Sequence, residues 1–310
     1  MSDTQKAQVI SQIDGVSAID VTTVEQAQTA VNESGQSHLY AIIELCQLAH
    51  DGTTNDGTTT DEPNGLTALY QQGSGSAQWD FMFAPEQGQD LKQAGPILIA
   101  LTEQADKDWL TQQLTQVPAG LFFTSQGDFN TTLHWAQQRL QLLSPNKAKS
   151  VCRFYDPRNV AFSLGAQTQA QQHAFWHQAQ QLTWFDAGQW WQTKLIPSDA
   201  PLIEQYALSH NEIAGITAFK EQVALQVLIN HYQQVKTKDA TPLQELVKQT
   251  FVDAKIYGAS THADFDSWLR VVLVHGSLFY QTEKINQILR TPHYPLHKKI
   301  ALAERELNHV

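Results

Sequence analysis

The stretch "GLFFTSQGDFNTTLHWAQQRLQLL", residues 120–143, joins two periodicities that decide the fold class. GLFFTS is a short apolar run that is typical of a buried strand. Apolar residues then recur every three or four positions, at Leu133, Ala136, Leu140 and Leu143, and this spacing predicts a helix with one apolar face. A strand followed directly by an amphipathic helix is the building unit of α/β proteins.

The same alternation extends on both sides of this stretch. The other runs that predict strands are "LYAIIELC" (39–46), "WDFMF" (79–83), "PILIALT" (96–102), "SVCRFYD" (150–156) and the Trp-rich "LTWFDAGQWWQTKL" (182–195). Another helix is expected around Trp109, Leu110 and Leu114. We therefore predict an α/β lobe over 38–198, with a mixed sheet and flanking helices.

The segments around this lobe differ in composition. Residues 1–37 are polar and Gln-rich and predict a helical N-terminal arm, and the Thr/Gly/Asp-rich stretch 50–65 predicts a flexible loop. The two prolines of "LIPSDAP" (195–201) predict a linker. Beyond it only helical periodicity is found, so we expect an all-helical C-terminal lobe over 199–310.

One helical segment of that lobe is apolar on more than one side, from 268 to 280. Each of its large apolar residues can be explained as part of the core of the lobe. As a group they offer more apolar surface than one packing face requires, so we also consider a partner-binding groove. Its candidate residues are Trp268, Leu269, Val272 and Phe279.

Charge and composition exclude several functions. The formal net charge of -11 repels phosphate backbones, so no nucleic acid is expected as a partner. The start "MSDTQKAQVI" lacks the features of a secretory signal, and no apolar run is long enough to span a bilayer. We expect a cytoplasmic location, no membrane insertion, and Cys46 and Cys152 as small buried thiols rather than a disulfide.

Signals for catalysis or metal binding are weak. His173 and His177 stand four apart in "HAFWH" and would share a helical face, but no third ligand or glutamate motif accompanies them. Residues 51–62 fail the calcium-loop pattern because Asp56 stands where glycine is needed. We expect no enzymatic activity, no metal and no cofactor. The alternative is a hydrolase or metal-dependent enzyme that uses His173 and His177.

The segment "RFYDPR" (153–158) is the sharpest feature of the sequence. Asp156 followed by Pro157 predicts a helix start, with the carboxylate as N-cap and proline in the first turn. Arg158 would then lie where the helix dipole disfavours a cation, and Arg153 would need a carboxylate partner if it is buried. Two interpretations remain open: an internal ionic clamp in which Asp156 serves both arginines, or a docking point for a partner. The residues concerned are Arg153, Phe154, Tyr155, Asp156, Pro157 and Arg158.

"LYAIIE", "GLFFTS" and above all "RFYDPR" resemble the family once labelled only as a domain of unknown function and associated with type VI secretion effector chaperones, or adaptors. The resemblance covers about residues 38–195, and Glu44 stands where family members commonly have an aspartate. It implies a cytoplasmic chaperone or adaptor that binds the N-terminal region of a cognate toxic effector and helps to load it onto the VgrG spike. Contact with VgrG itself is implied less directly.

Overall fold

The computed structural model describes residues 3–21, 23–24, 37–48, 67, 69–71, 73–83, 95–196, 203, 205–233 and 242–308. The chain divides into two compact units, one that ends at Phe219 and another that begins at Lys220. This division falls inside helix α9 (His210–Tyr232). The domain boundary expected near residue 198 stays a prediction, and the linker and loop 50–65 lie largely or wholly outside the described residues.

The first unit is built on a seven-stranded sheet, in the order β1-β9-β8-β5-β2-β4-β3. The strands are β1 (Val16–Ile19), β2 (His38–Glu44), β3 (Trp79–Phe81), β4 (Pro96–Ala100), β5 (Gly120–Ser125), β8 (Gln181–Asp186) and β9 (Gln189–Lys194). The predicted class, a sheet with flanking helices followed by a helical region, is confirmed. The pairings between these described strands are all antiparallel, so the expected mixed sheet is corrected to an antiparallel one.

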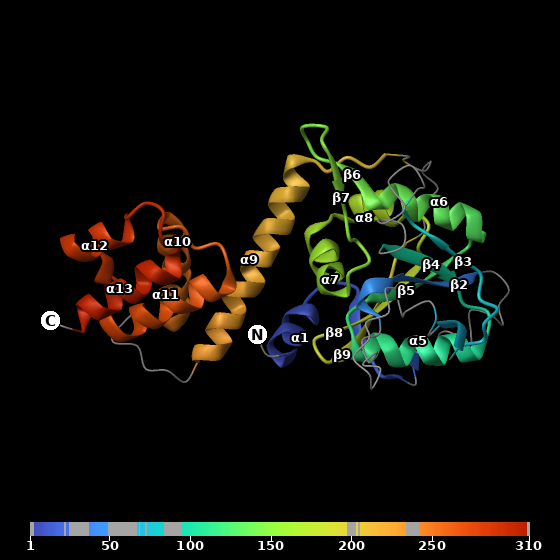
Figure 1. Ribbon diagram of the computed structural model, residues 1–310, viewed down its shortest axis with the longest axis horizontal. Coiled ribbons are helices and arrows are strands. Elements are labelled where there is room, and N and C mark those ends of the chain that lie inside the picture. Colours follow the sequence, from blue (N-terminus) through green and yellow to red (C-terminus); the bar gives the residue numbers. More distant parts are fainter. Residues whose placement is uncertain are drawn as a thin grey trace, which may run out of the picture. The chain divides into compact units, whose positions relative to one another are not determined.

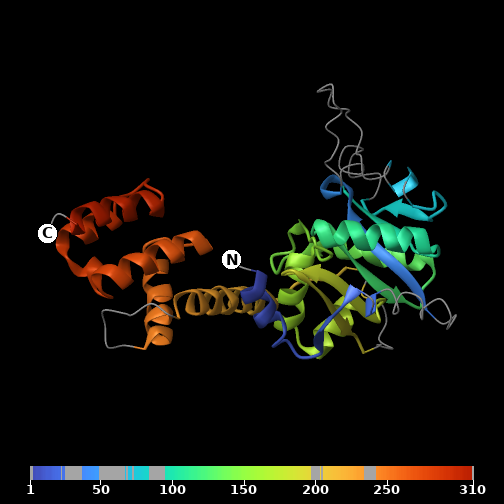
Figure 2. The same ribbon diagram turned by 90° about the horizontal axis from the view of Figure 1, so that it is seen from below.

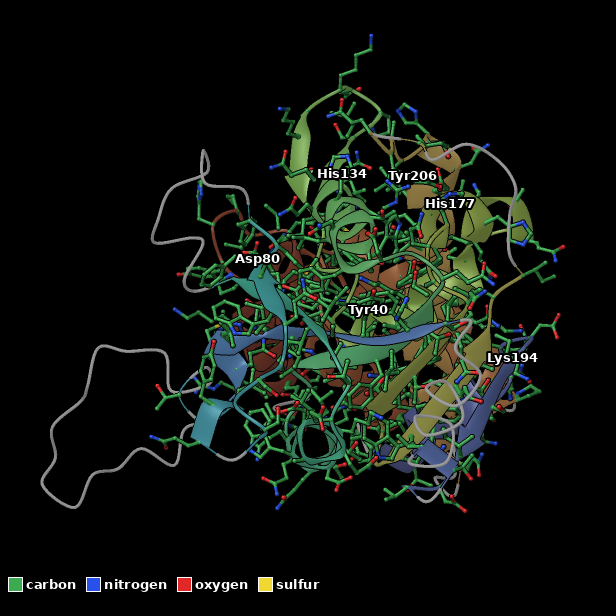
Figure 3. All side chains as sticks on the ribbon, turned by 90° about the vertical axis from the view of Figure 1, so that its right-hand side faces the viewer. Tyr40, Asp80, His134, His177, Lys194 and Tyr206 are labelled. Carbon is green, nitrogen blue, oxygen red and sulfur yellow. The ribbon has the colours of Figure 1, made fainter. Side chains whose placement is uncertain are left out.

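Both faces of the sheet are apolar, because its central strands carry long apolar runs. Along β5, Phe122 belongs to one core and Leu121 and Phe123 to the other, as the two-residue period of a strand requires. Helix α5 (Gln104–Gln116) covers the first face, and α6 (Phe129–Leu140), α7 (Pro157–Ala166) and α8 (Gln169–Trp176) cover the second (Figure 1). Figure 3 shows Tyr40 in the middle of this unit, with Asp80 and Lys194 towards opposite edges of the sheet.

The N-terminal segment differs from the expected helical arm. After helix α1 (Asp3–Ile10) the chain forms strand β1, which pairs with β9 at the edge of the main sheet. Lys6 forms a buried ion pair with Asp186, at 2.6 Å from Nζ to Oδ1. Because β1 has only four residues and is exposed at Ser17 and Ala18, its sequence lacks the alternation of apolar and polar residues that would predict a strand. Residues 25–36 of the expected arm lie outside the described part.

The strand expected over 150–156 is also shorter than predicted. Strand β7 (Lys149–Val151) ends before RFYDPR and pairs with β6 (Gln141–Leu143) in a two-stranded sheet that is separate from the main sheet. Helix α6 accordingly ends at Leu140 instead of reaching 143. Residues 152–156 form a turn that leads into α7, because Phe154 and Tyr155 are both buried and thus do not follow strand alternation.

The second unit is helical in its described part. Its elements after α9 are α10 (Leu243–Ile256), α11 (His262–His275), the 3-10 turn Phe279–Gln281, α12 (Glu283–Leu289) and α13 (Leu296–Leu307) (Figure 2). All four candidate groove residues lie in its core: Trp268, Leu269, Val272 and Phe279 are at most 5% exposed. They pack against other residues of the helical unit. The structure therefore corrects the expectation that they line a groove, and places them in the core. None of the described helices is both long and apolar enough to cross a membrane.

Candidate docking corner

The RFYDPR segment forms the corner at which α7 begins. The Asp156 carboxylate accepts a hydrogen bond from the backbone N–H of Arg158, and Pro157 occupies the first helical turn. This cap is the one that the sequence predicts, and it is confirmed. The buried carboxylate therefore fixes both the start of the helix and the place of the next side chain.

Arg158 is held by the same carboxylate. Its Nε lies 2.8 Å from Asp156 Oδ1 and its Nη2 lies 2.7 Å from Oδ2, a bidentate pair. The hydrogen bond to Asp156 raises the pKa of Arg158. The Asp156 side chain is 6% exposed and that of Arg158 is 50% exposed. The Asp156 carboxylate thereby compensates the unfavourable interaction of the Arg158 charge with the helix dipole. About half of the Arg158 side chain remains exposed to solvent.

Arg153 is held from another part of the chain. Its Nη2 lies 3.1 Å from Oε2 of Glu44, the last residue of β2. With its amide oriented to donate to the Pro118 carbonyl, Gln47 also accepts from Arg153 at 2.6 Å. Burial lowers the pKa of Arg153 but Glu44 raises it, and the net shift is upward. The expected clamp through Asp156 is therefore corrected: the ion pair of Arg153 is with Glu44, and Asp156 pairs with Arg158.

Glu44 is the shared anchor of the corner. The buried Tyr155 hydroxyl donates to it, and burial together with this bond raises the pKa of Tyr155 far above its usual value. The Cys46 thiol lies 3.5 Å from the other carboxylate oxygen. Cys46 and Cys152 are free thiols, as expected, but Cys46 is exposed and Cys152 half-buried, because both lie on the turns of this corner rather than inside strands.

The side chain of Phe154 fixes the corner to the core of the sheet unit. Its ring lies between 5.7 and 5.8 Å from those of Trp135, Phe175 and Trp176. Edge contacts of this kind add to the stabilisation from burial. The corner is thus a rigid base with two half-exposed guanidinium groups above it. Such preorganised donors suit carboxylate or carbonyl acceptors on a partner protein.

Part of this site escapes sequence reasoning. Glu44 and Tyr155 are 111 positions apart, and no spacing rule connects them. Gln47 lies in a short 3-10 turn with no motif. The one available signal is a charged residue at the end of an otherwise apolar strand, since a buried carboxylate requires a partner.

The two histidines of the alternative hypothesis lie at the end of α8. His173 is in its last turns and His177 follows it as the C-cap residue. Burial, and then the charge of Arg139, lowers the pKa of His177. Within the ranges that the structure describes, no three His, Cys, Asp or Glu residues come together in a group suited to a metal ion. The pair acquires no third ligand there.

Comparison with known proteins adds one match. Residues 59–174 match the family model described as "Domain of unknown function (DUF4123)", and this range includes the RFYDPR segment. No curated protein and no solved structure matches the chain. The matched region covers β3 to most of α8 and leaves out β1, β2, β8, β9 and the helical unit.

Proposed function

We propose that this protein is a cytoplasmic adaptor, or chaperone, that binds a cognate type VI secretion effector and helps to load it onto the VgrG spike. The matched family is associated with effector adaptors of this secretion system. The observation that carries the proposal is the RFYDPR segment inside the matched region, whose two half-exposed arginines are held by buried carboxylates, Asp156 within that region and Glu44 before it.

The geometry supports docking more than catalysis. A bidentate pair to Asp156 uses two of the five N–H donors of Arg158, and the remaining donors suit acceptors on a partner. Arginines that are fixed in this way lose little conformational entropy when a partner binds. The proposal assigns no catalytic residue and no metal, and elemental analysis that found one zinc per chain, lost in His173→Ala, would contradict it.

The experiment is a co-purification. The tagged full chain is expressed with candidate effectors and VgrG proteins encoded near its own gene, and both kinds of protein are assayed in the eluate. We expect the effector to be retained in a defined ratio, and VgrG to be retained only when the effector is present. Retention of neither protein from this or any neighbouring secretion cluster would overturn the proposal.

A further inference from the structure

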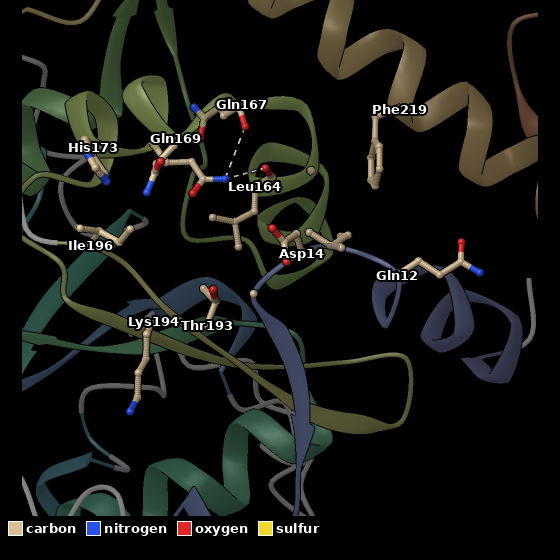
Figure 4. Close-up of a pocket in the computed structure, with 14 residues that line it drawn as sticks. Gln12, Asp14, Leu164, Gln167, Gln169, His173, Thr193, Lys194, Ile196 and Phe219 are labelled. Atoms are coloured by element: carbon tan, nitrogen blue, oxygen red, sulfur yellow. Dashed lines mark hydrogen bonds between the residues drawn. The ribbon is translucent and has the colours of Figure 1, made fainter.

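A cavity of about 470 Å³ lies in the sheet unit, away from the docking corner. Its walls come from the turn after α1, the junction of α7 with α8, the end of β9, and Phe219 of α9 (Figure 4). The corner is at the first residue of α7 and the cavity is at its last turn. A ten-residue helix is about 15 Å long, so the two sites are separate.

The wall is rich in side-chain amides. Four glutamines contribute to it, namely Gln12, Gln167, Gln169 and Gln172, beside the apolar Leu164 and Phe219. An amide offers both a donor and an acceptor, so such a wall matches a neutral ligand that carries both. Charge plays a small part: Asp14 is the acid of this wall, and the Lys194 side chain points away from the other side chains in Figure 4.

The lining is held in place by the fold. Gln172 Nε2 donates to the backbone carbonyls of Leu164, at 2.9 Å, and Gln167, at 3.4 Å, which joins α7 to α8. A Cβ atom at Gly165 would lie 2.6 Å from the Phe219 ring, so glycine is what lets this ring reach the wall. The wall is therefore fixed before any ligand arrives.

Two wall residues also carry polar atoms without a hydrogen-bond partner among the described residues. These atoms are Oε1 of Gln167 and Nε2 of His173, and both are buried. A buried polar atom that lacks a partner costs stability. Both atoms are closed to solvent, so they are not counted among the atoms that a ligand in the cavity would contact.

We propose that this cavity binds a short, uncharged, extended peptide segment of the partner protein, with one apolar side chain against Leu164 and the exposed Ile196. A peptide backbone alternates N–H donors with C=O acceptors, which the amide wall matches. The volume is in the range of about 300–1,000 Å³ that is usual for ligand pockets. This inference rests on the proposed adaptor function, and it adds a second contact site for the same partner.

The test uses the full chain with its histidine rings labelled for NMR. The probes are the capped peptide acetyl-Gly-Leu-Gly-amide, its charged analogue acetyl-Glu-Leu-Glu-amide, and N-acetylglucosamine as a neutral non-peptide. We expect saturable shifts of the His173 ring signals with the first probe and binding at least about fivefold weaker with the other two. Absence of a shift at His173, or preference for the sugar or for the charged peptide, would overturn the inference.

A matched pair of variants tests whether the peptide binds in this cavity. Gln169 lines the cavity and its neighbour Ala170 does not, although both are exposed on the first turn of α8. Gln169→Trp should abolish the His173 shifts, whereas Ala170→Trp should leave them unchanged. Equal binding by the two variants would contradict the assignment of the site to this cavity.

The same pair separates this inference from the adaptor function. If Gln169→Trp retains the effector with unchanged affinity, the cavity is not a partner site, while the adaptor function stands. If the capped peptide binds as expected and no effector is ever retained, the cavity is a peptide site and the adaptor function is wrong.

Discussion

At the scale of single residues, Glu44 and Arg153 contribute unequally to the docking corner. Glu44 is 10% exposed and has Arg153, Tyr155 and Cys46 as neighbours, whereas the Arg153 side chain is 42% exposed. A fully buried pair that loses one partner costs about 3–5 kcal/mol. A half-exposed arginine contributes much less, because water screens the pair and replaces the lost contact.

Arg153→Ala is therefore expected to lower the free energy of unfolding by about 1 kcal/mol or less. The Tyr155 hydroxyl continues to donate to Glu44 in this variant, so the carboxylate is not left unpaired. Urea unfolding followed by circular dichroism measures the difference, with Arg290→Ala in the helical unit as an exposed arginine control. If the free energy of unfolding fell by about 3 kcal/mol or more, the main role of Arg153 would be to stabilise the fold.

The tyrosines of the helical unit give a prediction for alkaline pH. Burial, and then hydrogen bonds to Asp266 and Asp253, raises the pKa of Tyr232 and of Tyr280 to about 12. An unfolded tyrosine titrates near 10, so between about pH 10 and 12 the unfolded chain releases protons that the folded chain keeps. Stability from these groups is thus complete below about pH 10 and is lost as the pH rises towards 12.

Titration of tyrosinate absorbance checks this prediction. Native protein should show several tyrosines that ionise later than in urea, and Tyr232→Phe and Tyr280→Phe should each remove one that ionises about two pH units later. Ionisation of all the tyrosines near pH 10 in the native protein would contradict the described hydrogen bonds.

At the scale of elements, the start of α7 depends on Asp156 in two ways. Its carboxylate caps the helix and also neutralises Arg158. Asp156→Asn keeps a capping oxygen but removes the charge, whereas Asp156→Ala removes both. We expect Asp156→Ala to cost about 1–2 kcal/mol of stability and Asp156→Asn clearly less. Thermal melts of the two variants separate the contributions, and equal losses would mean that the cap contributes nothing.

Elements with strong local signals are the ones that the sequence predicts. Strands β2, β4 and β5 form where apolar runs predict them, and the β8–β9 hairpin forms in the Trp-rich stretch. Helix α7 begins at its predicted cap. Strand β1 and the turn at 152–156 escape prediction, since both are stabilised by contacts with distant residues. The same reason applies to the site: its helix cap is local, and its Glu44 anchor is not.

At the scale of the whole molecule, the sheet unit extends beyond the predicted linker. Tyr206 is 5% exposed, and its ring lies 5.2 Å from that of Phe175. Phe219 lies 6.0 Å from Phe162 of α7. The segment that follows the linker thus supplies part of the core of the sheet unit.

Two truncations test this extension. A chain that ends at residue 200 loses both aromatic contacts and should be destabilised by several kcal/mol, because the loss of a large buried side chain alone costs about 3–5 kcal/mol. A chain that ends at Gln233 should keep a cooperative melt. If both truncated chains melt at the same temperature, the segment from 203 to 219 is not part of the unit.

The central claim is that the RFYDPR corner contacts the effector, and calorimetry with the co-purified effector tests it most directly. The double variant Arg153→Ala/Arg158→Ala keeps the Asp156 cap and the Tyr155–Glu44 contact, so it should fold. We predict that it binds the effector about tenfold more weakly or worse, a loss of about 1.4 kcal/mol or more, whereas Arg290→Ala binds like the parent protein. A folded double variant whose Kd equals that of the parent protein would contradict the account.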